Sequence, residues 1–173
     1  MYNSKTFVFK ASETTVVADA RFQKNKKKLL ITASTFPRYK GDSEPRFVLD
    51  LAVALLPYFD ITVLVPACPE SIEYEILEGI KVVRYHYFPI HKWETLCYPG
   101  AIVPRIKEKK IRILLVPFLL WGLYWNLRRM SKFVDAVHAH WLIPQGIVQS
   151  FLKKPYESWL TITFIPRKSR CCN

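Results

Sequence analysis

Short apolar runs alternate with polar, proline-containing stretches along this chain. Residues 29–33, 61–65 and 80–85 are runs in which Leu, Ile and Val predominate, each next to charged or proline residues. Runs of this length and composition are typical of strands buried on both faces of a parallel sheet. Residues 136–140 begin in the same way and end in polar side chains, which predicts a fourth strand.

Two segments have the residue spacing of helices. Apolar side chains in residues 44–56 recur three and four positions apart, at Phe47, Leu51, Ala54 and Leu55. This spacing predicts a helix with one buried face, for which Asp42 or Ser43 suits the N-cap and Pro45 the first turn. Residues 144–152 predict a second helix.

The alternation of strands and helices predicts an α/β fold. Right-handed crossovers between parallel strands give a Rossmann-like parallel sheet with helices on both faces. We assign this domain to residues 28–156, after a tail at 1–27 that we expect to be partly disordered. Residues 157–173 form an atypical C-terminal tail, although 159–165 are strand-like. No GxGxxG motif follows the first run, so a nicotinamide or flavin site is not expected.

The composition narrows the choice of partners. Lys and Arg number 26 against 14 Asp and Glu, a net charge of +12, which favours anionic ligands or surfaces. The charge is dispersed and no nucleic-acid motif is present, so we do not expect nucleic acid as a partner. The four cysteines include no CxxC pair, which argues against a cysteine zinc site, and a disulfide scaffold is not expected in so apolar a chain.

The loop after the first strand carries the first candidate chemistry. Gly41 lies just before the predicted helix, where free N–H groups could contact a phosphate. Arg38 and Arg46 add positive charge on either side of it. The alternative is a loop whose charges are only solvated.

The segment at the end of the fourth predicted strand carries the second set of candidate functional residues. Alternation places His138 and His140 on one face of the strand, and no third ligand lies nearby in sequence, so we expect no metal there. Polar contact or proton handling at a strand end is the better role for them. The alternative is a pair of hydrogen-bonded structural histidines.

Three stretches resemble the N-terminal half of family-4-like glycosyltransferases with the GT-B fold. The resemblance lies in the order and spacing of three stretches. These are the opening strand through Pro37 together with residues 41–52, the second strand at 60–67, and residues 135–146. The resemblance implies the acceptor side of a retaining, metal-independent transfer from a nucleotide-sugar donor, without a cofactor. The acceptor would be a saccharide or a lipid-linked glycan of a cell-envelope polysaccharide.

The resemblance also implies roles for individual residues. Gly41, Asp42 and Ser43 would approach the donor diphosphate, and His140 would be the catalytic residue near the reacting sugar. The remaining cleft residues on the acceptor side would be Arg38, Arg46, His138, Trp141, Gln145 and Gly146.

Residues 157–173 do not continue the family pattern, because the His-Gly that usually ends the next strand is missing and no donor-binding domain follows. We therefore expect a truncation or a reading-frame change in a longer gene, with a separate partner chain as the alternative. Without a donor half the chain alone should not transfer sugar. The competing interpretation is a non-catalytic remnant or binding module of the same fold.

Residues 105–132 predict a contact with membranes. The uninterrupted apolar run, 113–125, is thirteen residues long, which is shorter than the roughly 20 residues that span a bilayer. Trp121, Tyr124 and Trp125 between basic flanks suit a membrane interface. From the residues alone, an ordinary helix packed on the sheet is an equal alternative. The resemblance favours the membrane, because many such enzymes take lipid-linked acceptors, and it implies a cytoplasmic protein that is peripheral at the inner face of the cytoplasmic membrane.

Overall fold

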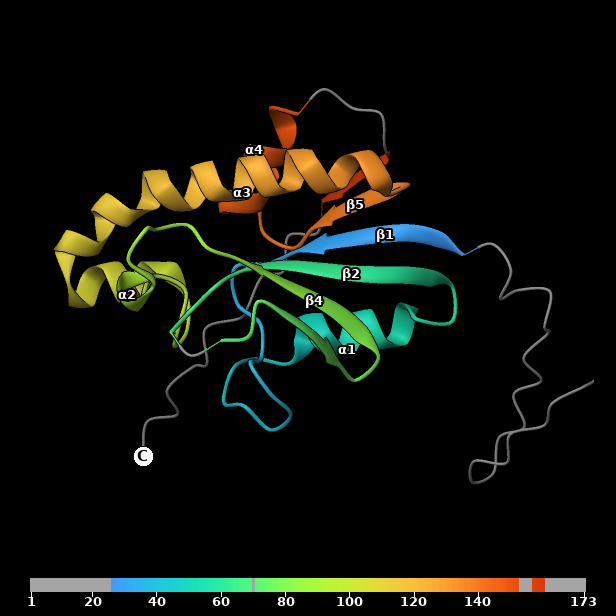
Figure 1. The fold of residues 1–173 in the computed structure, drawn as a ribbon, viewed down its shortest axis with the longest axis horizontal. Coiled ribbons are helices and arrows are strands. Elements are labelled where there is room, and N and C mark those ends of the chain that lie inside the picture. The colour runs from blue at the N-terminus through green and yellow to red at the C-terminus, as the bar shows by residue number, and fades with distance from the viewer. Residues whose placement is uncertain (1–25, 70, 153–156, 161–173) are drawn as a thin grey trace, which may run out of the picture.

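The computed structural model describes residues 26–69, 71–152 and 157–160, and shows a six-stranded mixed sheet in the order β3-β4-β2-β1-β5-β6 (Figure 1). Neighbouring strands are parallel, except that β3 runs antiparallel to β4. The strands are β1 (Lys27–Thr32), β2 (Phe59–Pro66), β3 (Tyr74–Leu77), β4 (Ile80–Tyr85), β5 (Ala136–Ala139) and β6 (Glu157–Leu160).

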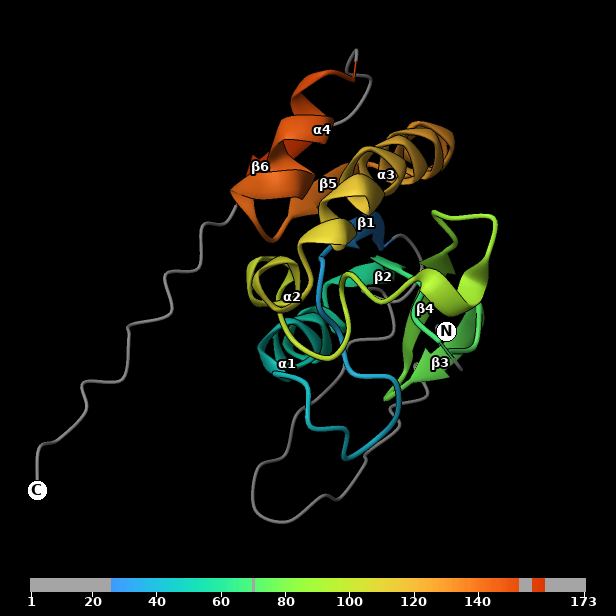
Figure 2. The same cartoon turned by 90° about the vertical axis from the view of Figure 1, so that its left-hand side faces the viewer.

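Helices cover both faces of this sheet, as Figures 1 and 2 show. One face carries α1 (Phe47–Leu55), and the other carries α3 (Val116–Met130) and α4 (Ile147–Ser150). The short α2 (Ile102–Glu108) lies past the carboxyl ends of β1 and β2 (Figure 1). The predicted α/β fold with helices on both faces is thus confirmed, and it is compatible with a Rossmann-like fold.

Alternating strand residues divide the core into two layers. Leu29 and Ile31 of β1 pack on the α1 side, and Leu30 between them packs on the α3 side. Helix α3 contributes a stripe spaced by four residues, which are Leu119, Leu123 and Leu127. Because these leucines are buried against the sheet, α3 lies along the domain as a packed helix.

Two helix boundaries differ from the predictions. Helix α1 begins at Phe47 and its N-cap is Arg46, with no side-chain hydrogen bond, so Asp42 and Ser43 are not caps. Residues 144–152 are not one continuous helix. An irregular turn, Leu142–Gly146, comes first, with an extended backbone at Ile143, and α4 follows it.

The sheet extends further at both edges than the sequence indicated. The hairpin strand β3 was not predicted, and β6 pairs in parallel with β5 inside the segment interpreted as a tail. The tail predicted at residues 1–27 lies outside the described residues except for 26 and 27, and so do residues 161–173.

Candidate functional site

The strand order places both predicted loops at one edge of the sheet, where that order reverses. The chain runs from β1 outward to β2 and β4, and later returns to β5 on the opposite side of β1. In open parallel sheets ligands bind at such a reversal, outside the carboxyl ends of the strands. The loop after β1 and the turn after β5 therefore flank the same position, which we call the switch-point site and define by Thr32, His140, Trp141 and Gln145.

Ring contacts and a backbone hydrogen bond hold the turn after β5 against β1 and the start of α1. The Phe47 ring, in the first turn of α1, meets His140 edge to face with 5.3 Å between centroids, and Trp141 at 5.9 Å. The backbone N–H of His140 donates to the carbonyl of Thr32 at 2.9 Å. The sequence marked Phe47 only as a core residue of a helix, and its role in supporting the site depends on tertiary packing.

The imidazole of His140 is buried without a hydrogen bond. The residue is 3% exposed, and neither ring nitrogen has a partner within the described part of the chain. Burial lowers the pKa of His140, so the ring is neutral at neutral pH. His138 lies 5.4 Å away between ring centroids, and its pKa is lowered by burial and by the neighbouring His140.

Further polar atoms of the same region lack partners. Both amide atoms of Gln145 are fully buried and unpaired in the described structure, as are the Thr32 hydroxyl and the indole N–H of Trp141. Leaving such a group unsatisfied costs about 1–3 kcal/mol. A bound molecule that exchanges hydrogen bonds with these groups would remove that penalty.

The Gly41 loop, in contrast, is closed on itself. The Asp42 carboxylate accepts hydrogen bonds from the backbone N–H groups of Arg38 and Ser43, both at 2.8 Å, and the N–H of Asp42 donates to the Tyr39 carbonyl at 3.2 Å. Gly41 sits in the left-handed region at φ +91°, with open space where a Cβ would be. The amides of Asp42 and Ser43 thus become available to a phosphate only if the loop opens.

The two arginines of this region are engaged with other side chains. The Arg38 guanidinium lies 3.8 Å from the Tyr98 ring centroid and donates to the Tyr98 hydroxyl. Arg46 donates to both carboxylate oxygens of Glu78, each at 3.0 Å, and so lies against the β3–β4 turn. The structure brings Trp141, Gln145 and both histidines to the switch point, but it gives Arg46 a structural partner elsewhere.

Arg84 holds the loop after β1 in position, and the sequence did not predict this role. Arg84 of β4 is 2% exposed and donates to the Pro37 carbonyl at 2.8 Å and to Glu75 at 2.5 Å. It ties the loop after β1 to the sheet. An arginine inside the otherwise apolar end of a strand was the available signal.

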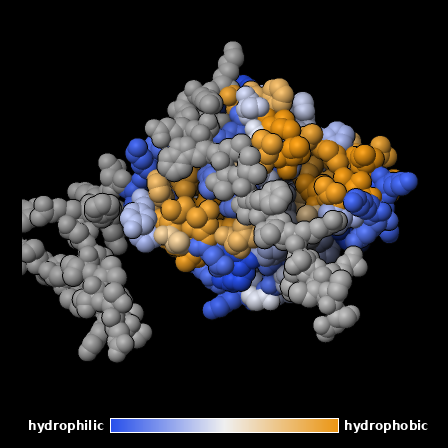
Figure 3. Space-filling view, turned by 180° about the vertical axis from the view of Figure 1, so that it is seen from behind, coloured by the Kyte–Doolittle hydropathy of each residue, from blue (hydrophilic) through white to orange (hydrophobic). Residues whose placement is uncertain are grey.

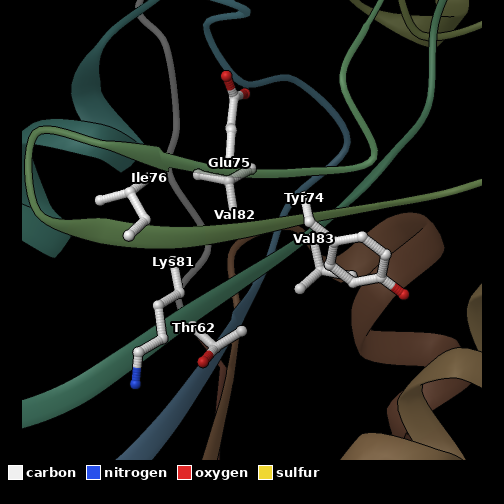
Figure 4. Close-up of a pocket in the computed structure, with 7 residues that line it drawn as sticks. All are labelled: Thr62, Tyr74, Glu75, Ile76, Lys81, Val82 and Val83. Carbon is white, nitrogen blue, oxygen red and sulfur yellow. The ribbon is translucent and has the colours of Figure 1, made fainter.

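Two of the hollows on the described surface bear on function, and both lie outside the switch point. A hollow of about 470 Å³ lies over β3, β4 and β2. Figure 4 shows the Glu75 side chain pointing away from that of Lys81, so these two charged groups of the hollow do not converge. A larger cavity of about 610 Å³ lies between the loop after β4 and the segment before α3. Its lining combines apolar and aromatic side chains with three cations, which are Lys92, Lys109 and Arg112.

The segments at the switch point carry a neutral imidazole, a carboxamide, a hydroxyl and an indole N–H, all buried and without a partner among the described residues. Together they offer hydrogen-bond donors and acceptors but no fixed charge. No protein-family model matches this chain, and no curated protein matches it in sequence. What the site binds is therefore inferred from its own chemistry.

Proposed function

We propose that this chain is the acceptor-side half of a GT-B glycosyltransferase, acting in retaining transfer of a sugar from a nucleotide-sugar donor to a lipid-linked or saccharide acceptor. One observation carries the proposal. His140 is buried, neutral and without a hydrogen-bond partner in the described chain, and it lies where a doubly wound sheet reverses its strand order. A ligand with hydroxyl groups would supply what His140 lacks.

The chemistry of the site favours a sugar over a free anion. A sugar hydroxyl both donates and accepts, as do a neutral imidazole, a carboxamide and a threonine hydroxyl. His140 and Gln145 would orient the reacting sugar, and the Gly41 loop would approach the diphosphate after opening. The resemblance puts most donor contacts in a second half, which a further domain or a partner chain would supply, with no metal in the transfer step.

An exposed apolar face supports a lipid-linked acceptor and a peripheral membrane contact. Seven large hydrophobic side chains between residues 111 and 133 are exposed, which are Ile111, Ile113, Leu114, Phe118, Trp121, Trp125 and Phe133. Figure 3 shows apolar residues gathered beside hydrophilic ones at the end of the molecule where α2 and the start of α3 lie. We call these seven residues the apolar face; the cavity of about 610 Å³ with its three cations opens beside them.

The helical segment that carries this face is longer than its apolar run. Residues Lys110–Phe133 form 24 helical residues, which by length and composition alone are enough to cross a membrane, in contrast to the thirteen-residue run counted from the sequence. The buried leucines of α3, packed on the sheet, favour attachment parallel to a membrane surface.

Saturation-transfer NMR with millimolar glucose, galactose, mannose and N-acetylglucosamine tests the proposal. His140→Phe and Gln145→Met keep volume but remove the unpaired polar atoms, so we expect loss of sugar signals with unchanged or higher stability. Lys81→Ala, which alters an exposed residue outside the site, is the control. If no sugar binds the wild type, or if both variants bind as well as it does, the proposal is wrong.

A further inference from the structure

A second cluster of chemically competent side chains lies away from the switch point. His86 follows β4 directly, and His91 and Glu94 lie in the loop that leads toward α2. Their ligand atoms all lie within 4.8 Å of one another. The Nδ1 atom of His86 is 2.8 Å from Oε2 of Glu94, and the Nδ1 atom of His91 is 3.5 Å from that same oxygen.

The carboxylate of this cluster is held in a fixed orientation. The Glu94 side chain is fully buried, and its Oε1 accepts hydrogen bonds from the backbone N–H groups of Tyr87 at 2.7 Å and Phe88 at 3.0 Å. Those bonds leave Oε2 directed at the two imidazoles. Orientation of a ligand by outer hydrogen bonds of this kind is a regular feature of metal centres.

The two histidines form the open side of the cluster. Their rings lie 3.9 Å apart between centroids, and their side chains are 36% and 61% exposed, so a cation can reach them from solvent. A single carboxylate oxygen, Oε2 of Glu94, faces both rings. A divalent cation between the three groups would satisfy all of them.

We propose that His86, His91 and Glu94 form a zinc site. Two imidazole nitrogens and one carboxylate oxygen are a known ligand set for Zn²⁺ when a fourth position stays open to water. Tetrahedral bonds of about 2.0–2.1 Å place ligand atoms roughly 3.3 Å apart. The two distances from the imidazole nitrogens to Oε2 of Glu94, 2.8 and 3.5 Å, lie on either side of that value. These three residues include no cysteine and lie far in sequence from His138 and His140, so the sequence did not predict the cluster.

The consequence of zinc binding lies in the neighbouring cavity. Phe88, Lys92, Trp93 and Thr95, which line the cavity of about 610 Å³, belong to the same loop as the zinc ligands. A bound metal would fix this loop and therefore the cavity wall. The zinc site shares no residue with the switch-point site, so a test of zinc binding and a test of sugar binding can give different outcomes.

Equilibrium dialysis and calorimetry with ZnCl₂ test the site, on the full chain without a histidine tag. Cys171 and Cys172 are adjacent and could bind zinc themselves, so the experiment uses the variant with both changed to Ser. We expect one zinc per chain and, with Co²⁺ as a probe, the visible absorption of tetrahedral coordination. Zinc at 100 times Kd should raise Tm by about 5–10 °C.

Ligand variants make the test specific. His86→Ala and His91→Ala should each lower zinc affinity at least tenfold, whereas Lys92→Ala, an exposed neighbour that is not a ligand, should not change it. Glu94→Gln keeps an acceptor for the two backbone N–H groups and should also lower affinity, with the fold checked by circular dichroism. The proposal is overturned if zinc does not bind to the parent protein. It is also overturned if both histidine variants bind zinc with the affinity of the parent protein.

Discussion

Asp42 serves the loop after β1 rather than the helix that follows it. The sequence predicted a helix cap or a phosphate contact, but the carboxylate binds the N–H groups of Arg38 and Ser43 and pairs with the Arg38 guanidinium. Burial alone would raise the pKa of Asp42, but these hydrogen bonds and the nearby charge outweigh it and lower that pKa. The residue therefore stabilises the fold as long as it is ionised.

Replacing Asp42 by Asn should lower the free energy of unfolding at pH 7 by about 1–3 kcal/mol, since one charged acceptor of a buried network is lost. The lowered pKa means that this contribution is present above the unfolded pKa of about 4 and is lost as pH falls through the folded value. Urea denaturation at pH 7 and pH 3 measures both effects. The exposed Asp50→Asn is the control; equal losses in the two variants would contradict the role of Asp42.

The two histidines at the carboxyl end of β5, His138 within it and His140 just after it, should make the protein sensitive to mild acid. Burial lowers the folded pKa of His138 and His140, so the unfolded chain binds more protons as pH falls below about 6.5. Stability is full above that pH and declines toward the lowered folded values. Urea midpoints between pH 8 and 5 should fall less steeply in the double variant His138→Gln, His140→Gln, and an unchanged slope would show that neither ring is buried as neutral imidazole.

At the scale of elements, Gly122 of α3 lies close against the end of β4 and the residues that follow it. A Cβ built there would lie 3.1 Å from Cβ of Tyr87 and 3.3 Å from the Tyr85 ring. Glycine is unfavourable inside a helix by about 1 kcal/mol relative to alanine. Its presence in the middle of α3 is therefore explained by this contact.

Gly122→Val should destabilise the protein by about 1–3 kcal/mol, because the branched side chain must displace backbone and ring atoms. Arg129→Val introduces the same residue on the exposed side of the same helix and should change stability by less than about 0.5 kcal/mol. Thermal unfolding of the two variants gives the comparison. Similar Tm values would mean that α3 can shift away from the sheet without loss.

The sequence predicted elements well where an apolar pattern alone determines them. Strands β1, β2 and β4 follow from their apolar runs, and the meeting of the two loops follows from the parallel topology. Strand β3 was missed because Tyr74 and Ile76 are exposed at an edge, without the pattern of a buried strand. The start of α1, the closed Gly41 loop and the cluster around Glu94 depend on contacts between distant residues, which a linear pattern does not contain.

For the whole molecule, the net charge and the apolar face together predict binding to an anionic bilayer. The protein should float with phosphatidylglycerol vesicles at low salt, and binding should weaken at 0.5 M NaCl as screening reduces the attraction of its excess cations. Trp121→Ser with Trp125→Ser should abolish flotation. Tyr58→Ser with Tyr74→Ser removes two exposed aromatic side chains outside the apolar face and is the control. The apolar face would be excluded as the membrane contact if the control variant lost flotation, or if the double tryptophan variant still floated.

The hydrogen bonds of Arg84 to Glu75 and to the Pro37 carbonyl limit how far this domain could be shortened by design. Strand β3 looks dispensable, since a parallel sheet of β4, β2, β1, β5 and β6 would keep the doubly wound order without it. Removing the hairpin would nevertheless leave Arg84 buried without its carboxylate, a defect worth about 3–5 kcal/mol. The same guanidinium holds the Pro37 carbonyl of the loop after β1, so this loop would then depend on an arginine that has lost its carboxylate, and a minimal scaffold built on this fold must retain its antiparallel edge.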